Sequence, residues 1–364
     1  MKILLYFGHP AQYLFLRETI RRLLKTENYQ LVVLIKTKDV LENLLKSDGI
    51  PYQNILLHER GKSKFAIILS LFRRLFSISK ILLKEKPDLL IGTDATIAQL
   101  GFLFRIQRIT ITEDDYDVIK TLGNLTYPYT QTILCPNVCD VGKWKYKKVG
   151  YDGYMKLGYL HPNVFTPNPQ KINKYNLKKP FVLIRLARLT AHHDFGISGI
   201  SHQLLQELIF QISNKGFEIY ISSEASLNSQ FLDFQLNIHP EDMHHVLSMA
   251  SLLICDSQSM SVEAAMLGVP SIRYSSFAGK ISVLEELEHS YNLTYGVLPG
   301  DQDKLIQILD ELLSSKNLKE IFQDRRQIML SEKIDVTDFV EWFIKNYPNS
   351  ILNTYNTPSN TTKA

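Results

Sequence analysis

Short apolar runs alternate with amphipathic stretches over roughly the first 150 residues of the chain. The runs are apolar throughout, without a polar residue at every second position, and Gly, Pro or small polar residues bound them. Such runs are typical of parallel strands that helices cover on both faces. Strands are predicted at residues 3–7, 31–36, 88–92, 109–112 and 132–135, and the intervening helices include 11–25 and 62–86.

Residues 151–180 break this alternation, because prolines recur without a helical period. The alternation restarts with strands at 181–186, 218–222, 252–255 and 271–274. The fold class is therefore α/β, with two Rossmann-like doubly wound lobes facing across a cleft. The predicted boundaries are 1–155 for the first lobe, 156–180 for the linker, 181–349 for the second lobe and 350–364 for a flexible tail.

Composition narrows the class of protein. The 364 residues are 45% hydrophobic and 21% charged, as in a globular chain, and the formal charge is only +4. That charge permits an anionic ligand but gives no reason to expect nucleic acid, which needs a concentrated basic patch. Cys135, Cys139 and Cys255 form neither a disulfide framework nor a zinc pattern. We therefore expect reduced thiols, no metal site and a cytoplasmic protein.

The charge pattern leaves two interpretations of residues 62–86, one of which is contact with a membrane surface. We expect no signal peptide, because the first apolar run is short, and no spanning helix, because no apolar run reaches about 18 residues. Residues 62–86, however, combine an apolar face with seven Lys and Arg residues. Such a helix can lie on an anionic membrane surface. The alternative is a crossover helix that packs on the core and exposes a solvated basic face.

The most informative segment runs from 252 to 270, where a buried strand ends in a small polar loop and a helix follows. The backbone N–H groups of Ser257, Ser259, Met260 and Ser261 are predicted to open that helix, where free donors and the helix dipole stabilise phosphate. Glu263, in the first turns, can accept hydrogen bonds from ribose hydroxyls. The alternative is that the serines only cap the helix and Glu263 complements its dipole.

Arginines follow or end neighbouring predicted strands. Arg185, Arg188 and Arg273 would reach the carboxyl ends of the sheet, where ligands of doubly wound proteins collect, and could converge on a diphosphate. Ordinary ion pairing between the lobes is the alternative.

Histidines supply two candidates for a general base. His193 lies in a His-His-Asp run, where Asp194 would orient it, and adjacent residues in such a run cannot all bind one metal. His9 follows Gly8 at the first strand–helix turn and is either a base or a helix cap. This turn lacks the GxGxxG fingerprint, which argues against a dinucleotide.

Carboxylates follow two other strands of the first lobe. Asp94 comes after the strand at 88–92, and Glu113, Asp114 and Asp115 come after the strand at 109–112. Paired carboxylates can divide acid and base roles when their surroundings separate their pKa values. The alternative is that these residues are solvated N-caps of the helices that follow.

Several stretches of the second lobe resemble a poorly characterised bacterial domain family encoded in surface-polysaccharide clusters. That family is similar in fold to glycosyltransferase-B (GT-B) enzymes and to non-hydrolysing UDP-GlcNAc 2-epimerases. The stretches are 159–162, 183–185, 191–194, 221–224, 256–270 and 272–280. The resemblance implies an acceptor side in the first lobe and a nucleotide-sugar side in the second. In the epimerases, first-lobe acids transfer protons, but their Arg-Pro-Glu run is missing here after Arg273.

The resemblance favours a glycosyltransferase that takes a nucleoside-diphosphate sugar, UDP-linked, as substrate and needs no further cofactor. His9, Asp94, Asp114 or His193 would supply the catalytic base. The acceptor would be a glycan or a lipid-linked sugar, consistent with peripheral contact of 62–86 with the inner membrane face. A nucleotide-sugar 2-epimerase and a noncatalytic nucleotide-sugar-binding scaffold are the two alternatives.

Overall fold

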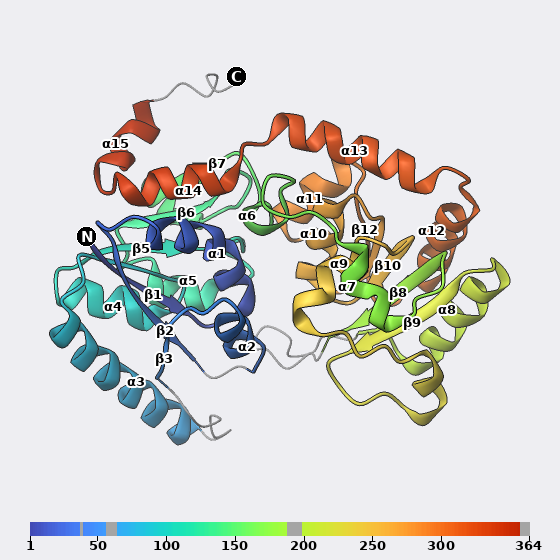
Figure 1. Ribbon diagram of the computed structural model, residues 1–364, viewed down its shortest axis with the longest axis horizontal. Coiled ribbons are helices and arrows are strands. Elements are labelled where there is room, and N and C mark those ends of the chain that lie inside the picture. The colour runs from blue at the N-terminus through green and yellow to red at the C-terminus, as the bar shows by residue number, and fades with distance from the viewer. Residues whose placement is uncertain (37–38, 56–63, 188–198, 357–364) are drawn as a thin grey trace. The chain divides into compact units, whose positions relative to one another are not determined.

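The computed structural model describes residues 1–36, 39–55, 64–187 and 199–356. The chain divides into two compact units. Unit 1 comprises Met1–Tyr159 and Ile334–Ala364, and unit 2 comprises Leu160–Lys333. The described part therefore contains two α/β units, each built on its own sheet (Figure 1).

Unit 1 holds a seven-stranded sheet in the order β3-β2-β1-β4-β5-β6-β7, and all its strand pairs are parallel. The order reverses between β1 and β4, so this sheet is doubly wound and its switch point lies between those two strands. The strands are β1 (Lys2–Phe7), β2 (Gln30–Ile35), β3 (Gln53–Asn54), β4 (Leu89–Gly92), β5 (Gln107–Ile111), β6 (Thr132–Pro136) and β7 (Lys148–Tyr151).

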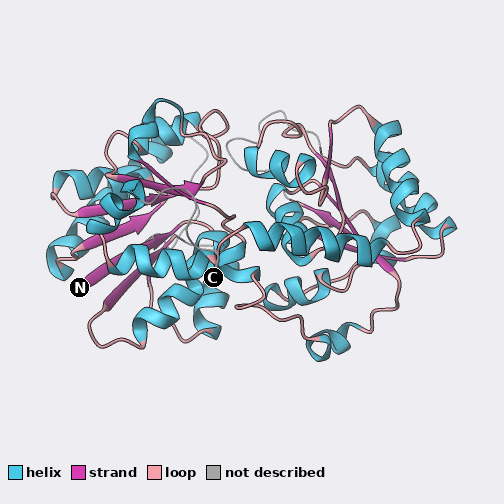
Figure 2. Ribbon diagram, turned by 90° about the horizontal axis from the view of Figure 1, so that it is seen from above, coloured by secondary structure: helices cyan, strands magenta, loops and turns pink. Residues whose placement is uncertain are grey.

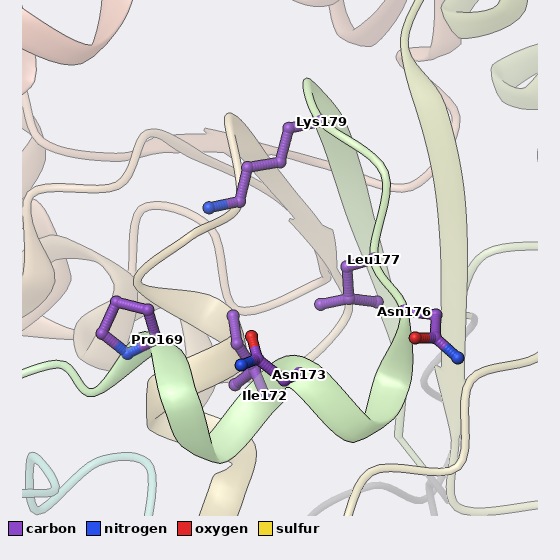
Figure 3. A pocket seen from close by; sticks show the side chains of 6 residues that line it. All are labelled: Pro169, Ile172, Asn173, Asn176, Leu177 and Lys179. Carbon is purple, nitrogen blue, oxygen red and sulfur yellow. The ribbon is translucent and has the colours of Figure 1, made fainter.

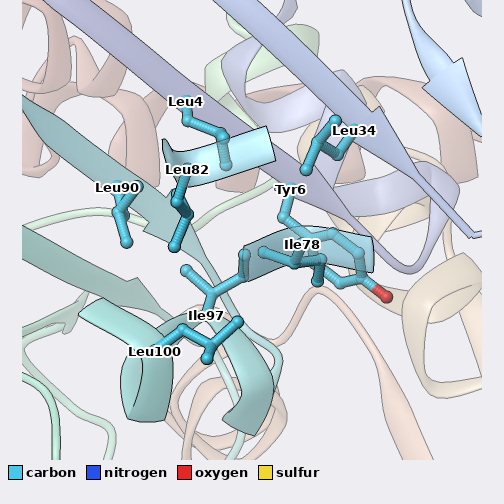
Figure 4. Packing of buried hydrophobic residues seen from close by; sticks show 8 residues of the cluster. All are labelled: Leu4, Tyr6, Leu34, Ile78, Leu82, Leu90, Ile97 and Leu100. Atoms are coloured by element: carbon cyan, nitrogen blue, oxygen red, sulfur yellow. The ribbon is translucent and has the colours of Figure 1, made fainter. Parts of the chain in front are cut away.

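Helices cover both faces of this sheet (Figure 2). One layer contains α1 (Pro10–Leu24) and α2 (Asp39–Ser47), which contact each other. The other contains α3 (Lys64–Glu85), α4 (Ala95–Leu103) and α5 (Lys120–Thr126), with α4 between its neighbours. Beneath α3 and α4, aliphatic side chains and one tyrosine form a buried cluster (Figure 4): Leu4, Tyr6, Leu34, Ile78, Leu82, Leu90, Ile97 and Leu100.

The C-terminal segment returns to unit 1, which differs from the predicted boundary of the second lobe at residue 349. Helix α14 (Val336–Lys345) packs on α1 and buries Val340 and Phe343. Arg22 of α1 donates from Nη1 to Asp338 at 2.6 Å and to Glu341 at 2.9 Å. The segment predicted as a flexible tail begins with α15 (Asn349–Asn356), in which Ser350 is buried.

Unit 2 holds a five-stranded parallel sheet in the order β12-β11-β10-β8-β9, so its switch point lies between β8 and β10. The strands are β8 (Phe181–Leu186), β9 (Glu218–Ser223), β10 (Leu252–Cys255), β11 (Ser271–Tyr274) and β12 (Tyr295–Val297). Their helices are α8 (His202–Asn214), α9 (Met243–Leu247), α10 (Gln258–Leu267), α11 (Ser282–His289), α12 (Gln302–Ser314) and α13 (Leu318–Glu332).

The remaining elements are short. The stretch predicted as a structureless connection contains α6 (Leu157–Leu160), α7 (Pro169–Ile172) and the 3₁₀ helix η2 (Asn173–Tyr175). Further 3₁₀ helices are η1 (Gly142–Lys147), η3 (Ser229–Phe234) and η4 (Pro240–Asp242). The α/β class with two doubly wound parallel sheets is confirmed.

Candidate functional site

The polar groups of unit 2 gather where its strand order reverses. The carboxyl ends of β8 and β10 lie side by side there, since Ile184 pairs with Ile254 and Arg185 with Cys255. The loop after β10 is only Asp256-Ser257, and α10 begins at Gln258. The start of α10 is therefore held at the sheet edge where doubly wound proteins bind their ligands.

The first turn of α10 offers fewer donors than the sequence predicts. Ser257 is the N-cap, and its Oγ accepts from Met260 N at 3.4 Å while its carbonyl accepts from Ser261 N at 3.3 Å. Because the first helical N–H groups have no partner within the helix, those of Gln258 and Ser259 remain to receive a ligand. Both residues are half-buried and so border solvent.

Met260 and Ser261 do not fit their predicted role in substrate binding. The Ser261 side chain is fully buried, and its Oγ lies 2.9 Å from Ser271 Oγ and 2.6 Å from Thr294 Oγ1. The Met260 amide is occupied by the Ser257 cap, and its residue is buried. Both residues are thus buried, whereas Gln258 and Ser259 of the first turn border solvent.

Two arginines, half-buried Arg326 and buried Arg273, lie at opposite ends of α10. At the C-terminal end, Arg326 Nε donates to Met266 O at 2.5 Å, where a cation complements the negative end of the helix dipole. At the N-terminal end, Arg273 Nη1 donates to the Oε1 atom of Gln258, the first residue of α10, at 2.8 Å. A cation there adds to the positive end of the dipole, which is unfavourable for an empty site and favourable for one that holds an anion.

The sequence analysis predicted that Arg273 converges on a diphosphate at the strand end, but its side chain is wholly buried on β11. Its Nε and Nη2 atoms have no hydrogen-bond partner among the described residues. Burial lowers the pKa of Arg273, while the charge of Glu288 raises it. Gly296 lies against this arginine, because a Cβ at that position would come within 2.8 Å of Arg273 Nη2. Arg273 therefore acts on the α10 start through Gln258, whose Nε2 also donates to Ser275 Oγ at 2.6 Å.

Asp256 ties the two strands of the switch point together. Its Oδ1 accepts the N–H of Ala187, which directly follows β8, at 2.7 Å. Burial raises the pKa of Asp256 to about 6, against the lowering effect of this backbone hydrogen bond. The same carboxyl group is thus a fixed acceptor beside the α10 start and titrates near neutral pH.

Arg185 forms an ion pair within its own unit. Its Nη1 donates to Ser222 Oγ at 2.9 Å and its Nη2 to Glu224 Oε1 at 2.6 Å, both at the end of β9. The Arg185 side chain is 15% exposed and that of Glu224 is 48% exposed. The guanidinium group is thus held at the carboxyl edge of the sheet, with its charge offset by one exposed carboxylate.

Glu263, the predicted ribose partner, lies in the second turn of α10 and is buried. Its Oε2 lies 3.4 Å from Nε2 of His244 on α9. The rings of Phe165 and His244 meet edge to face with centroids 6.1 Å apart, and Phe165 stacks on His245 at 4.8 Å. Glu263 is therefore placed by a histidine and aromatic cluster that the sequence analysis missed.

Two predicted site residues, Arg188 and His193, lie outside the described residues, as do His192 and Asp194. The segment that carries them directly follows β8 in the chain.

The switch point of unit 1 differs from that of unit 2. His9 is exposed and is the N-cap of α1, where its Nδ1 accepts from Ala11 N at 3.2 Å. An imidazole nitrogen that accepts an amide hydrogen bond is unprotonated, so neutral His9 carries its proton on Nε2. In this conformation His9 presents a donor through Nε2 instead of the lone pair that a general base needs.

Asp94 uses both oxygens within unit 1. Oδ1 caps α4 by accepting from Thr96 N at 2.8 Å, and Oδ2 pairs with Arg74 Nη1 at 3.0 Å. Its side chain is 20% exposed and that of Arg74 is 16% exposed. Capping, which the sequence analysis held as the alternative to catalysis, accounts for the position of this carboxylate.

The three carboxylates after β5 have three different surroundings. The Glu113 side chain, which is 10% exposed, pairs with the ammonium group of Lys156 and also accepts from Met155 N at 2.5 Å. Asp115 is buried and accepts from Asp140 N at 2.7 Å. Asp114 alone of the three is exposed.

Two hollows have linings that include no residue of α10. One, of about 360 Å³, is an open depression of unit 2 around α7 (Figure 3), lined by Pro169, Ile172, Asn173, Asn176, Leu177 and Lys179. The other is a crevice between the ends of β1 and β4, lined by Tyr6, Phe7, Gln12, Leu16, Ile91, Gly92, Thr93 and Ile111. This crevice has room for about one water molecule. Neither brings together titratable groups for chemistry.

Among the described residues, no group of three or more His, Cys, Asp or Glu side chains is arranged to hold a metal ion. The residues that the sequence analysis missed are Gln258, Asp256 and His244. Gln258 and Asp256 stand in the motif itself, and their proximity to the strand end was the available signal. His244 had none, because its contact with Glu263 joins two helices.

No protein-family model and no curated protein matches the sequence. Solved structures do match. A UDP-GlcNAc 2-epimerase from Neisseria meningitidis bound to UDP-GlcNAc is 16% identical, with 95% of this chain and 100% of that chain covered and a TM-score of 0.72. A putative UDP-N-acetylglucosamine 2-epimerase from Listeria monocytogenes is 13% identical over 95% and 96% of the two chains, with a TM-score of 0.70.

A glycosyltransferase from Streptomyces sp. SF2575 is also similar, at 13% identity over 95% of this chain and 99% of that chain, with a TM-score of 0.57. Identities this low show a shared fold. The chain has the two-sheet α/β fold found in UDP-GlcNAc 2-epimerases and GT-B glycosyltransferases.

Proposed function

We propose that this protein is a glycosyltransferase whose donor is a nucleoside-diphosphate sugar bound at the α10 start of unit 2. One observation carries the proposal: a buried cation, Arg273, and the positive end of a ten-residue helix adjoin with no carboxylate hydrogen-bonded to that arginine among the described residues. Their potentials add, the charge of Glu288 offsets part of this positive potential, and a diphosphate would offset the rest.

The donor would be held by groups with separate tasks. The N–H groups of Gln258 and Ser259 would donate to the diphosphate oxygens. Arg273, which donates to the side-chain amide oxygen of Gln258, would hold that turn in place. Its charge would also stabilise the negative charge that grows on the leaving diphosphate. Glu263 would accept from the ribose, with His244 fixing its carboxylate.

Unit 1 supports the transferase over the epimerase. An epimerase that removes and returns a proton uses positioned acid and base groups. Here Asp94 is engaged by Arg74 and by the α4 cap, and Glu113 by Lys156 and Met155. A transferase needs one base for the acceptor hydroxyl. Among the described residues, exposed Asp114 is the candidate for this base. The acceptor proposed is a glycan or lipid-linked sugar of surface polysaccharide or glycolipid synthesis.

The first test is binding. Purified protein is titrated calorimetrically with UDP, GDP, CMP and dTDP, and its thermal unfolding is followed with the corresponding sugar nucleotides. A ligand present at about 100 times its dissociation constant raises the free energy of unfolding by about 2.7 kcal/mol. Absence of binding by every nucleotide contradicts both the donor site and the proposed function.

The second test separates chemistries. With the sugar nucleotide that binds, a transferase releases nucleoside diphosphate only when an acceptor extract is added. Isomerisation of the sugar nucleotide alone would establish the second candidate, a nucleotide-sugar 2-epimerase, which the TM-scores of 0.72 and 0.70 favour. Binding without either reaction would establish the noncatalytic scaffold.

A further inference from the structure

The outer surface of the α3–α4 layer exposes large apolar side chains. On α3, Phe76 is 64% exposed and Leu83 is 61% exposed. On α4, Phe102 is 56% and Leu103 is 72% exposed. The inner sides of these helices pack on the sheet through Ile78 and Leu82 of α3 and Ile97 and Leu100 of α4 (Figure 4). Since the two helices contact each other, their outer sides belong to one surface.

Cations accompany these apolar groups. Arg73, Phe76, Lys80 and Leu83 follow one another at spacings of three, four and three residues, which places them on one stripe of α3. Arg73 and Lys80 are exposed, and the Lys80 ammonium lies 4.3 Å from the centroid of the Phe76 ring. We name these four residues with Phe102 and Leu103 the basic apolar face.

Acidic groups are almost missing from this layer. The sequences of α3, α4 and α5 together contain one carboxylate, Glu85, and it pairs with Lys2 Nζ at 3.1 Å. The basic apolar face therefore presents positive charge without neighbouring negative charge on its own helices. A surface with this composition matches an anionic layer that also accepts apolar side chains.

We propose that the basic apolar face docks this protein on anionic lipid bilayers, with α3 lying in the interfacial plane. Phe76, Leu83, Phe102 and Leu103 enter the headgroup and acyl boundary, and the long side chains of Arg73 and Lys80 reach lipid phosphates. The attachment is peripheral, because no helix among the described residues is long and apolar enough to span a bilayer. The inference does not depend on the sugar chemistry of unit 2.

A lipid surface fits better than a protein partner. The apolar groups are separated by cations and stand on convex helix surfaces, whereas a protein interface has a desolvated core depleted of charged residues. Lipid headgroups adapt to such an arrangement, and phosphate is available beside each cation.

The test is flotation of the full chain with phosphatidylcholine vesicles that either contain or lack phosphatidylglycerol. We expect binding to the anionic vesicles only, weakened by salt because the exposed charges are screened. The double variant Phe76→Ser/Leu83→Ser should lower the partition coefficient at least about tenfold. Lys80→Gln should lower it about fivefold, the share of one cation near such a surface.

The matched control lies in the opposite helix layer. Leu24 is 47% exposed at the end of α1 and is followed by exposed Lys25, so Leu24→Ser/Lys25→Gln removes the same kinds of group. Binding of this control should equal that of the wild type. Circular dichroism and sedimentation of every variant check the fold and the oligomeric state.

Three outcomes overturn the proposal: no binding of the wild type to anionic vesicles, an equal loss in the control, or an oligomer that dissociates in Phe76→Ser/Leu83→Ser while vesicle binding persists. The last would identify the basic apolar face as an interface between copies of this chain. Calorimetric binding of nucleotide is measured on the same samples, so failure here is distinguishable from failure of the donor site.

Discussion

The two switch points of this molecule share a topology and differ in how their polar groups are satisfied. At the end of β4 in unit 1, Asp94 pairs with Arg74 and caps α4, and Nε is the only buried atom of that arginine without a described partner. At the ends of β10 and β11 in unit 2, Arg273 keeps two nitrogen atoms without described partners, and α10 begins with two N–H groups that have no partner within the helix.

This difference separates a structural arrangement from a binding arrangement. A polar group that already has its partners gains little from a ligand, whereas buried donors without partners carry a desolvation cost that a ligand can remove. The charged groups of unit 1 are therefore expected to govern stability, and those of unit 2 to govern affinity for an anion.

The largest effect is expected at the buried pair of unit 1. Replacing Lys156 by Met leaves Glu113 charged, buried and without its cation, which should lower the free energy of unfolding by about 3–5 kcal/mol. Lys156→Met/Glu113→Gln should recover most of this loss, because the Gln oxygen can still accept from Met155 N. Urea denaturation measures both. Full stability of the single variant combined with lost activity would instead make Glu113 a catalytic group.

In unit 2, removing the buried charge of Arg273 should alter the affinity for UDP. Arg273→Met removes a positive charge beneath the α10 start, and we expect the calorimetric dissociation constant of UDP to rise about tenfold to a hundredfold. Arg326→Met is the control, since Arg326 is half-buried and also contacts α10, but at its C-terminal end. The control should lose stability and keep its UDP affinity. Equal UDP affinity of both variants would refute the assignment of the site to the helix start.

The stability of the folded protein is expected to depend on pH through Asp256 in unit 2. Because burial raises its pKa to about 6 in the folded protein, above its ordinary value of 3.8, the folded state binds this proton more tightly than the unfolded chain. Its stabilising contribution is complete at pH values below the unfolded pKa and is lost as the pH rises through about 6.

Asp256→Asn, which keeps an acceptor for Ala187 N, should therefore be more stable than the wild type at alkaline pH by about 1–2 kcal/mol. The gain should vanish in acid. Thermal unfolding across pH measures it, with exposed Asp233→Asn as the control in the same unit. A gain that is independent of pH would show that the titration of Asp256 is not its source.

The smallest effect is expected at Asp94. Asp94→Asn preserves the α4 cap and removes the ion pair with Arg74, which should cost about 1 kcal/mol in the free energy of unfolding. Sugar transfer, once an acceptor is identified, should continue at the wild-type rate. A large loss of turnover with unchanged stability would restore Asp94 to the catalytic role that the sequence suggested.

Much of the framework was predictable from local pattern. The strands at 181–186, 252–255 and 271–274 agree with β8, β10 and β11, because continuous apolar runs bounded by Gly and Pro leave few other structures. The brief strands β3, β7 and β12 escaped notice, since a run of two to four residues at a sheet edge has too little pattern. The boundary of unit 2 differed because α14 packs on α1, more than 300 residues earlier in the chain.

The sequence by itself determined the α/β class, the two parallel sheets and the placement of Ser257 before a helix, because strand periodicity and helix capping are properties of neighbouring residues. Only the tertiary structure decided which charges are satisfied. Arg273 lies on strand β11 and Arg74 lies within helix α3, and in neither case do the neighbouring residues in the sequence show which partner the arginine meets. Arg74 donates to a carboxylate from another element, whereas Arg273 has the charge of Glu288 nearby without a hydrogen bond to it among the described residues, because the partners of a buried charge come from segments distant in the chain.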